Sequence, residues 1–167
     1  MEKDLDALSR KVAIALMDKN YTMATAEECT CGLLGACIAS QVYAQRWYKG
    51  SIVTYTEEMA GKLLEVPQYT IERNDFVSSQ VAQQMALTAL YKFNVNICTS
   101  VIGYVEGTGS VNVAAGEVQI CVAKLDKQNN ISFKYKKVRV TGNNRAKNIE
   151  VALEEALRTT LEHIIGI

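Results

Sequence analysis

The sequence predicts an α/β fold: a three-layer α/β/α sandwich around a mixed β-sheet, formed by residues 1–167 as a single domain. Two observations carry this prediction. Segments with apolar residues at helical spacing alternate with short β-rich runs, an order typical of helices that connect strands of one sheet. The last two β-rich runs are separated by a short polar turn, which predicts a hairpin and makes the sheet mixed.

The first part of the chain alternates helices with strands. Residues 5–18 repeat apolar side chains at helical spacing, and Asn20 is a plausible stop. Pro67 ends a later helix, because its ring disfavours helical backbone in the residue before it. The other elements expected here are a strand at 22–26, a helix with Leu33, Leu34, Cys37 and Ile38 on its apolar face, a strand at 51–55 and a helix at 57–64.

The second part of the chain contains the clearest helix. Ser78 is a good N-cap for it, and apolar residues follow at Val81, Met85, Ala89 and Tyr91. We then expect a buried strand at 97–103, strands at 117–125 and 131–140 joined by the polar turn 126–130, and a long closing helix at 146–165.

The composition excludes several classes of protein. Hydrophobic residues make up 49% of the chain, which is enough for a sizeable core. The 18 basic residues balance 18 acidic ones without a basic tract, so we expect no nucleic-acid partner. No apolar run approaches the length that spans a membrane, and the first residues lack the order of a signal peptide. We therefore expect a cytoplasmic protein with no membrane association.

The cysteines do not form a recognisable metal motif. There are five, an odd number, which favours reduced thiols. Cys29 and Cys31 are close in sequence, but zinc needs four nitrogen or sulfur ligands and the single histidine, His163, is far along the chain. We expect no metal and no cofactor.

The segment 25–33 is the most informative part of the chain. It leads from a predicted strand into a predicted helix, where free backbone N–H groups and the helix dipole favour anions and nucleophiles. Glu28 places a carboxylate where a hydroxyl or thiol nucleophile would be expected. This turn is therefore either an unusual active site or one that has lost its reaction.

Several blocks together resemble the C-terminal domain of the CinA (competence/damage-inducible protein) family, whose active members are nicotinamide mononucleotide deamidases. The family motif T-A-E-S-C-T-G-G-L is similar to Thr25-Ala26-Glu27-Glu28-Cys29-Thr30-Cys31-Gly32-Leu33. Further similar blocks lie at 46–51, 55–66, 67–71 and 76–86, with no gap between Thr25 and Ala86. The resemblance implies a homo-oligomer, for which the stretch near Trp47 is a candidate contact, and a nucleotide-like small-molecule ligand.

The departures from the family fall on its catalytic pair. The family's serine nucleophile falls on Glu28, and the lysine that activates it falls on Ala60. Lys62 lies two helical positions further on, about 200° around the axis, so it is a poor substitute. We therefore predict a protein without the family's amidase activity.

The family's nucleotide-binding loop is altered as well. The family run V-T-G-I-A-G-P-G-G corresponds to residues 101–109, in which Gly103 and Gly109 match but Tyr104 is bulky and Glu106 adds a negative charge. Arg145 stands one place later than the family's arginine and is a weak candidate for facing an anion. A phosphorylated ligand would meet Glu28 and Glu106, which disfavours its binding.

The neighbours of Glu28 have structural and functional interpretations. We expect Glu28 itself to be a carboxylate stabilised by the helix dipole, and Cys29 and Thr30 to be structural. Tyr55 is expected to pack at a strand end. The alternatives are an active amidohydrolase that uses Cys29 or Thr30 as nucleophile, and a metal-assisted hydrolase built on Glu27 and Glu28. If the activity is lost, a ligand-binding or regulatory role remains.

Overall fold

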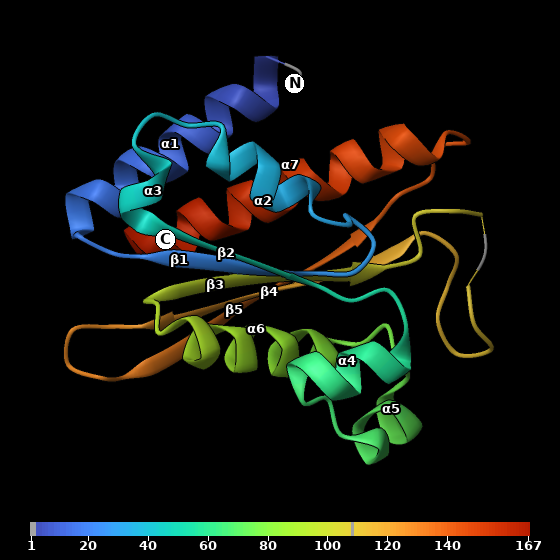
Figure 1. The fold of residues 1–167 in the computed structure, drawn as a ribbon. Coiled ribbons are helices and arrows are strands. Elements are labelled where there is room, and N and C mark those ends of the chain that lie inside the picture. Colours follow the sequence, from blue (N-terminus) through green and yellow to red (C-terminus); the bar gives the residue numbers. More distant parts are fainter. Residues whose placement is uncertain (1–2, 108) are drawn as a thin grey trace.

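The computed structural model describes residues 3–107 and 109–167; Met1, Glu2 and Thr108 of the expected domain lie outside the described residues. A five-stranded sheet separates two layers of helices (Figure 1). The predicted three-layer α/β/α sandwich is confirmed.

The elements follow one another along the chain in the order that the sequence predicts, with two short helices added. The helices are α1 (Lys3–Lys19), α2 (Leu33–Ala39), α3 (Ala44–Trp47), α4 (Glu57–Leu64), α5 (Gln68–Asn74), α6 (Ser79–Phe93) and α7 (Arg145–Ile165). The strands are β1 (Met23–Glu27), β2 (Tyr48–Val53), β3 (Ile97–Gly103), β4 (Glu117–Leu125) and β5 (Ile131–Arg139).

The strand order in the sheet is β2-β1-β3-β4-β5. Strand β1 pairs in parallel with both β2 and β3, whereas β4 runs antiparallel to β3 and to β5, so the sheet is mixed as predicted. Because β1, β2 and β3 are parallel, their carboxyl ends meet at one edge of the sheet. Ligands of open α/β sheets bind at this kind of edge.

Helices cover both faces of the sheet. Helices α1, α2, α3 and α7 lie on one face, and α4, α5 and α6 lie on the other (Figure 1). Each interface has its own apolar core: Leu16, Ile97 and Leu157 belong to the first, Met85 and Ile102 to the second. No helix in the described ranges is long and apolar enough to cross a membrane.

Some boundaries differ from the expectation for local reasons. Helix α3 has four residues, too few to show a periodic pattern. Helix α5 begins directly after Pro67, because proline is compatible with the entry to a helix although it disfavours helix before itself. Strand β2 begins three residues and ends two residues earlier than expected, and its last residue, Val53, pairs with Glu27 at the end of β1.

Three side chains lie elsewhere than expected. Leu33 and Tyr91 are 47% and 60% exposed, because they are offset around their helices from the buried Leu34 and Leu90 by about 100°. Trp47 is 3% exposed and lies in the core beside α1 and α2. Trp47 therefore belongs to the core, whereas Val42 and Tyr43 of the same stretch are 71% and 53% exposed, and the predicted contact between copies near Trp47 stays a prediction.

Candidate active site

Glu27 organises the turn that precedes α2. Its carboxylate is fully buried and accepts hydrogen bonds from the backbone N–H groups of Gly32 (2.9 Å), Leu34 (3.0 Å) and Gly35 (2.8 Å). It also accepts from three hydroxyls, those of Thr25, Thr30 and Ser51. This carboxylate satisfies the free N–H groups at the start of α2. The expectation that Glu28 has this role is wrong, because the helix begins only at Leu33.

The side chain of Glu28 points to a different strand. Its backbone N–H donates to the Val101 carbonyl (2.9 Å), and its Oε2 accepts from the Gly103 N–H (3.1 Å). The two adjacent carboxylates therefore diverge, Glu27 toward α2 and Glu28 toward the end of β3. Among the described residues, no cluster of three or more His, Cys, Asp or Glu side chains is placed to hold a metal ion.

Glu28 lines a small pocket at the carboxyl edge of the parallel strands. The cavity measures about 120 Å³, and its other lining residues are Tyr55, Gly103, Tyr104, Val105, Glu106 and Arg145. Burial raises the pKa of the Glu28 carboxyl from 4.5 to about 7, although the Gly103 N–H and the Arg145 charge oppose the shift. Near neutral pH, Glu28 is therefore divided between its protonated and charged forms.

Arg145 closes one side of this pocket from the first turn of α7. Its Nε donates to Glu106 Oε1 (2.6 Å) and its Nη2 donates to Tyr55 Oη (2.6 Å). The anion that this arginine faces is thus a carboxylate of its own chain. Tyr55 is 53% exposed, and its hydroxyl serves this polar contact, so the expectation that it packs at a strand end is wrong.

Three segments far apart in sequence meet here because of the topology. Tyr55 follows β2, Glu28 follows β1, and residues 104–106 follow β3. Gly103 and Arg145, which the family resemblance suggests for ligand binding, both line the pocket; their binding role stays a prediction. Gly109 does not line it; a Cβ there would lie 2.3 Å from the Val113 carbonyl oxygen, so this glycine allows a tight loop.

The position of the family's activating lysine holds no amine. Ala60 is fully buried in the core between α4, α6 and the sheet. Lys62 lies on the outer side of α4 and is paired with Glu58. The geometry agrees with the helical offset predicted between these two positions.

The two candidate replacement nucleophiles are buried. Cys29 is 1% exposed, and burial together with the Glu28 charge raises the pKa of its thiol. Thr30 is fully buried, and its hydroxyl donates to Glu27 Oε2 (2.6 Å). A thiol that resists ionisation and a hydroxyl that is already bound are both poor nucleophiles.

Two residues near the pocket escaped the sequence reasoning. Asn148 is 4% exposed; its side chain donates to the carbonyls of Val105 and Gly142 and thereby ties the pocket loop to α7. Thr54 is 2% exposed, and its hydroxyl has no hydrogen-bond partner among the described residues. In the sequence, the one hint of a role for Asn148 was its position directly before the apolar Ile149. That hint is weak by itself.

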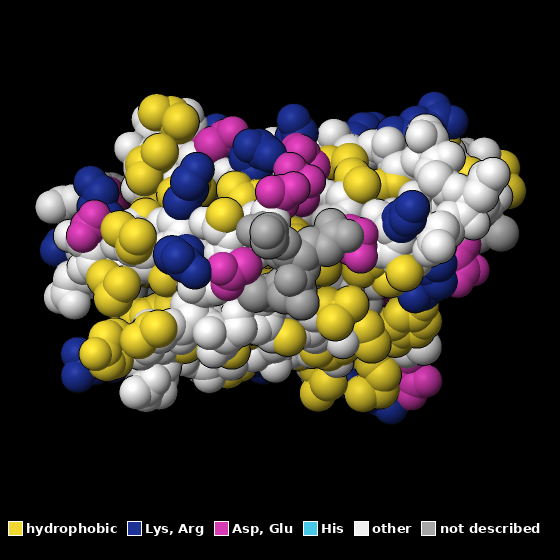
Figure 2. All heavy atoms as spheres, turned by 90° about the horizontal axis from the view of Figure 1, so that it is seen from above, with side chains coloured by type: hydrophobic (Ala, Val, Ile, Leu, Met, Phe, Trp, Pro, Cys, Tyr) yellow, Lys and Arg dark blue, Asp and Glu magenta, His cyan; other side chains and the backbone are white. Residues whose placement is uncertain are grey.

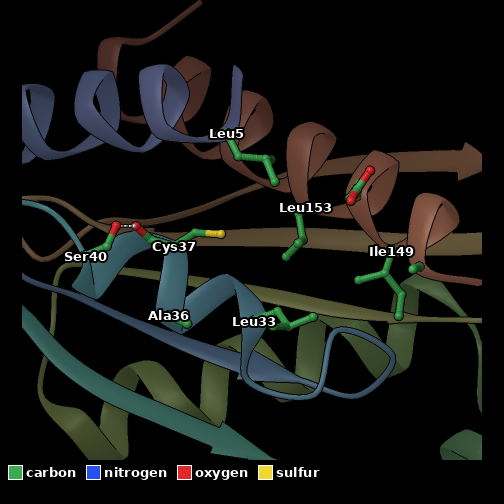
Figure 3. Close-up of a pocket in the computed structure, with 9 residues that line it drawn as sticks. Leu5, Leu33, Ala36, Cys37, Ser40, Ile149 and Leu153 are labelled. Atoms are coloured by element: carbon green, nitrogen blue, oxygen red, sulfur yellow. Dashed lines mark hydrogen bonds between the residues drawn. The ribbon is translucent and has the colours of Figure 1, made fainter. Parts of the chain in front are cut away.

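A larger hollow elsewhere on the surface has a different character. It measures about 510 Å³ and lies between α1, α2 and α7, with Leu5, Leu33, Ile149 and Leu153 on its walls (Figure 3). Its lining is mainly apolar, with Glu150 as its charged side chain. The chemistry-bearing groups converge instead on the smaller pocket beside Glu28.

The fold defines the class: this is an α/β/α protein with an open mixed sheet and a small pocket at the carboxyl edge of its parallel strands. The family model of the CinA C-terminal domain matches residues 5–164 of this chain. The chain belongs to this family.

Relatives and solved structures agree with that assignment. The chain is 31% identical over 158 residues to the protein MG115 homolog of Mycoplasma pneumoniae, covering 95% of this chain and 97% of that protein. It is 34% identical over 102 residues to the nicotinamide-nucleotide amidohydrolase PncC of Enterobacter agglomerans, covering 61% and 62% of the two chains. A CinA superfamily protein from Klebsiella pneumoniae has the same fold, with a TM-score of 0.89, 24% identity and coverage of 98% and 99%.

The lengths of the relatives differ. A CinA-like protein of Flavobacterium psychrophilum is 32% identical over 151 residues, which are 90% of this chain but 35% of that protein. The chain thus spans about a third of this longer relative and nearly all of the mycoplasma protein.

Proposed function

We propose that this chain is a nicotinamide-nucleotide amidohydrolase-like protein that does not hydrolyse amides and that uses its pocket to bind a small molecule. The observation that carries the proposal is the state of the two positions where the family resemblance places a serine and a lysine. One holds the Glu28 carboxylate, bonded to the Gly103 N–H, and the other holds the buried Ala60. A Ser/Lys mechanism needs both groups.

The alternative, an active amidohydrolase with Cys29 or Thr30 as nucleophile, has less support. Both side chains are buried, and neither lines the pocket. Loss of any basal activity in Cys29→Ala would favour this alternative.

We also propose that the protein is a cytoplasmic homo-oligomer. The described cysteines are free, which fits a reducing compartment. On the face formed by α1, α2 and α7, hydrophobic side chains lie among basic and acidic ones (Figure 2), and Ile14, Leu33 and Val151 are each more than 40% exposed. Light scattering on the purified protein would give the oligomeric state.

The proposal is tested by restoring the missing pair. The double variant Glu28→Ser with Ala60→Lys would be assayed for ammonia release from nicotinamide mononucleotide, beside the wild type and each single variant. We expect release only from the double variant, because the hydroxyl and the amine work as a unit. Ammonia release from the wild type at the rate of an active relative would contradict the proposal.

A control keeps this test interpretable, because Ala60 is fully buried and a lysine there can destabilise the core. Thermal unfolding of each variant would establish that it is folded at the assay temperature. A folded but inactive double variant would place a second obstacle in the altered loop at 103–106.

A further inference from the structure

The backbone that follows β3 has a fixed place beside the small pocket at the carboxyl edge of the sheet. The Tyr104 N–H donates to the Glu117 carbonyl at the start of β4 (2.9 Å). Val105 is 3% exposed, and its carbonyl accepts a hydrogen bond from the buried Asn148 side chain (2.9 Å). Because these bonds tie the loop to β4 and to α7, any change at the pocket has to come from its side chains.

One side of the pocket is formed by exposed side chains that bond to one another. Arg145 Nε donates to Glu106 Oε1 (2.6 Å), and Arg145 Nη2 donates to Tyr55 Oη (2.6 Å). The side chains of Arg145 and Glu106 are 41% and 58% exposed. Water competes for the partners of such a pair, so an exposed ion pair contributes little to stability and opens readily.

This contact occupies the basic group of the pocket. Arg145 is the one basic side chain among the described lining residues. A guanidinium binds anions through its charge and its fork of N–H donors, and two of these donors are already used. The Glu106 carboxylate is thus an anion of the same chain, held where an anionic group of a ligand would compete for Arg145.

We propose that the contact of Arg145 with Glu106 and Tyr55 is an autoinhibitory latch. In the closed state the latch keeps Arg145 in the chain's own hydrogen bonds, and an anionic ligand gains Arg145 only by displacing Glu106. The inference rests on the proposed function, because it concerns the regulation of the pocket that binds a small molecule there. The loop backbone stays in place while the side chains exchange partners.

The latch reduces the affinity for an anionic ligand by a predictable amount. The apparent affinity falls in proportion to the fraction of molecules in which Arg145 is free. An exposed ion pair with one further hydrogen bond leaves roughly a tenth to a third of the molecules open. Removal of either bond should therefore strengthen the binding of an anion about three- to tenfold.

The latch itself can be followed by NMR through the side-chain Nε–H of Arg145, assigned by its loss in Arg145→Lys. In the wild type this N–H is bonded to a carboxylate and should be protected from exchange with water. Glu106→Gln should lose part of this protection. The matched control is Glu154→Gln, which breaks an Arg158–Glu154 pair of similar exposure on the same helix and should leave the Arg145 signal unchanged. An unprotected Arg145 N–H in the wild type would overturn the inference.

The inhibition is tested by the binding of nicotinamide mononucleotide, which carries a phosphate, to the full chain in a calorimeter. The charge of Glu106 would repel a phosphate even without a latch, so two variants keep the net charge. Glu106→Asp retains a carboxylate on a shorter side chain, and Tyr55→Phe removes only a hydroxyl. Both variants, like Glu106→Gln, should bind the mononucleotide about three- to tenfold more tightly than the wild type.

The controls separate the latch from charge repulsion and from folding defects. Glu154→Gln should leave the affinity unchanged, and neutral nicotinamide should show no gain with any variant. Glu28 is present throughout, so its charge cancels in the comparison. Thermal unfolding establishes that each variant is folded. A gain in Glu106→Gln alone would indicate simple repulsion and overturn the latch, as would the absence of any gain in all three variants.

Failure of the latch is distinguishable from failure of the proposed function. Ammonia measured in the same samples reports hydrolysis of the mononucleotide, and its release by the wild type would overturn the proposed function. The latch is judged by the protection of the Arg145 N–H and by the order of the affinities.

Discussion

At the scale of residues, the two adjacent carboxylates show how environment sets their roles. Glu27 is surrounded by six hydrogen-bond donors at the start of α2. Glu28 accepts one bond from the Gly103 N–H and lies in a pocket with a second carboxylate, Glu106. We therefore assign Glu27 to the stability of the turn and Glu28 to the pocket.

Glu27→Gln should destabilise the protein by at least about 2 kcal/mol, because hydrogen bonds to a buried charged group contribute more than neutral ones. The amide nitrogen of glutamine would also face N–H donors. Chemical denaturation measures the change. The control Glu58→Gln lies on the surface, and its effect should stay within about 0.5 kcal/mol. Equal effects of the two substitutions would contradict the assigned role of Glu27.

Glu28 should make the stability of the fold depend on pH. A carboxyl whose folded pKa is about 7 holds its proton more tightly than the unfolded chain, where the pKa is near 4.5. Its contribution is complete below the unfolded value and is lost as the pH rises to about 7, a loss on the order of 3 kcal/mol. Glu28→Gln should remove this dependence, so denaturation curves of the two proteins should separate between pH 5 and pH 7. Parallel curves would be inconsistent with a raised pKa.

At the scale of elements, α2 lies against the sheet only because it carries a glycine. A Cβ at Gly35 would lie within 3.4 Å of side-chain atoms of Tyr48, Glu27 and Ser51, and closest to the Tyr48 hydroxyl. That hydroxyl is 3.0 Å from Thr25 Oγ1, so it is held in place. The close approach brings the N–H groups of α2 to the Glu27 carboxylate.

Gly35→Ala should therefore destabilise the protein by about 1–3 kcal/mol, although alanine favours helices. Gly61 in α4 offers a matched comparison, because the nearest atom to a Cβ there lies at 3.6 Å, an ordinary contact. Gly61→Ala should stabilise by up to about 1 kcal/mol. Thermal unfolding of both variants measures the pair, and shifts of the same sign would contradict the assigned contact.

At the scale of the whole molecule, local signals predicted the fold well. Ser78 caps α6 as expected, its Oγ accepting from the Val81 N–H, and the bounds of α4, β3 and β4 agree with their patterns. The site was less predictable, since Arg145 at the start of α7 bonds to Tyr55, ninety positions away in sequence, and no local pattern indicates a contact between α7 and the segment after β2. The carboxylate at the start of α2 was predicted to be Glu28 but is Glu27. This difference could not be predicted because it depends on the residue at which α2 begins.

The central proposal is that this member of the CinA family has the family fold but does not carry out the amidase reaction. Its support is the carboxylate at Glu28, the buried Ala60 and the outward-facing Lys62. The family fold remains intact around these positions.

The most direct test is the conversion of nicotinamide mononucleotide by the wild-type protein, followed by proton NMR at high protein concentration, with an active PncC relative as positive control. We predict that the carboxamide ring signals stay unchanged over hours while the relative completes its conversion. Conversion to the carboxylate at a comparable rate would contradict the claim.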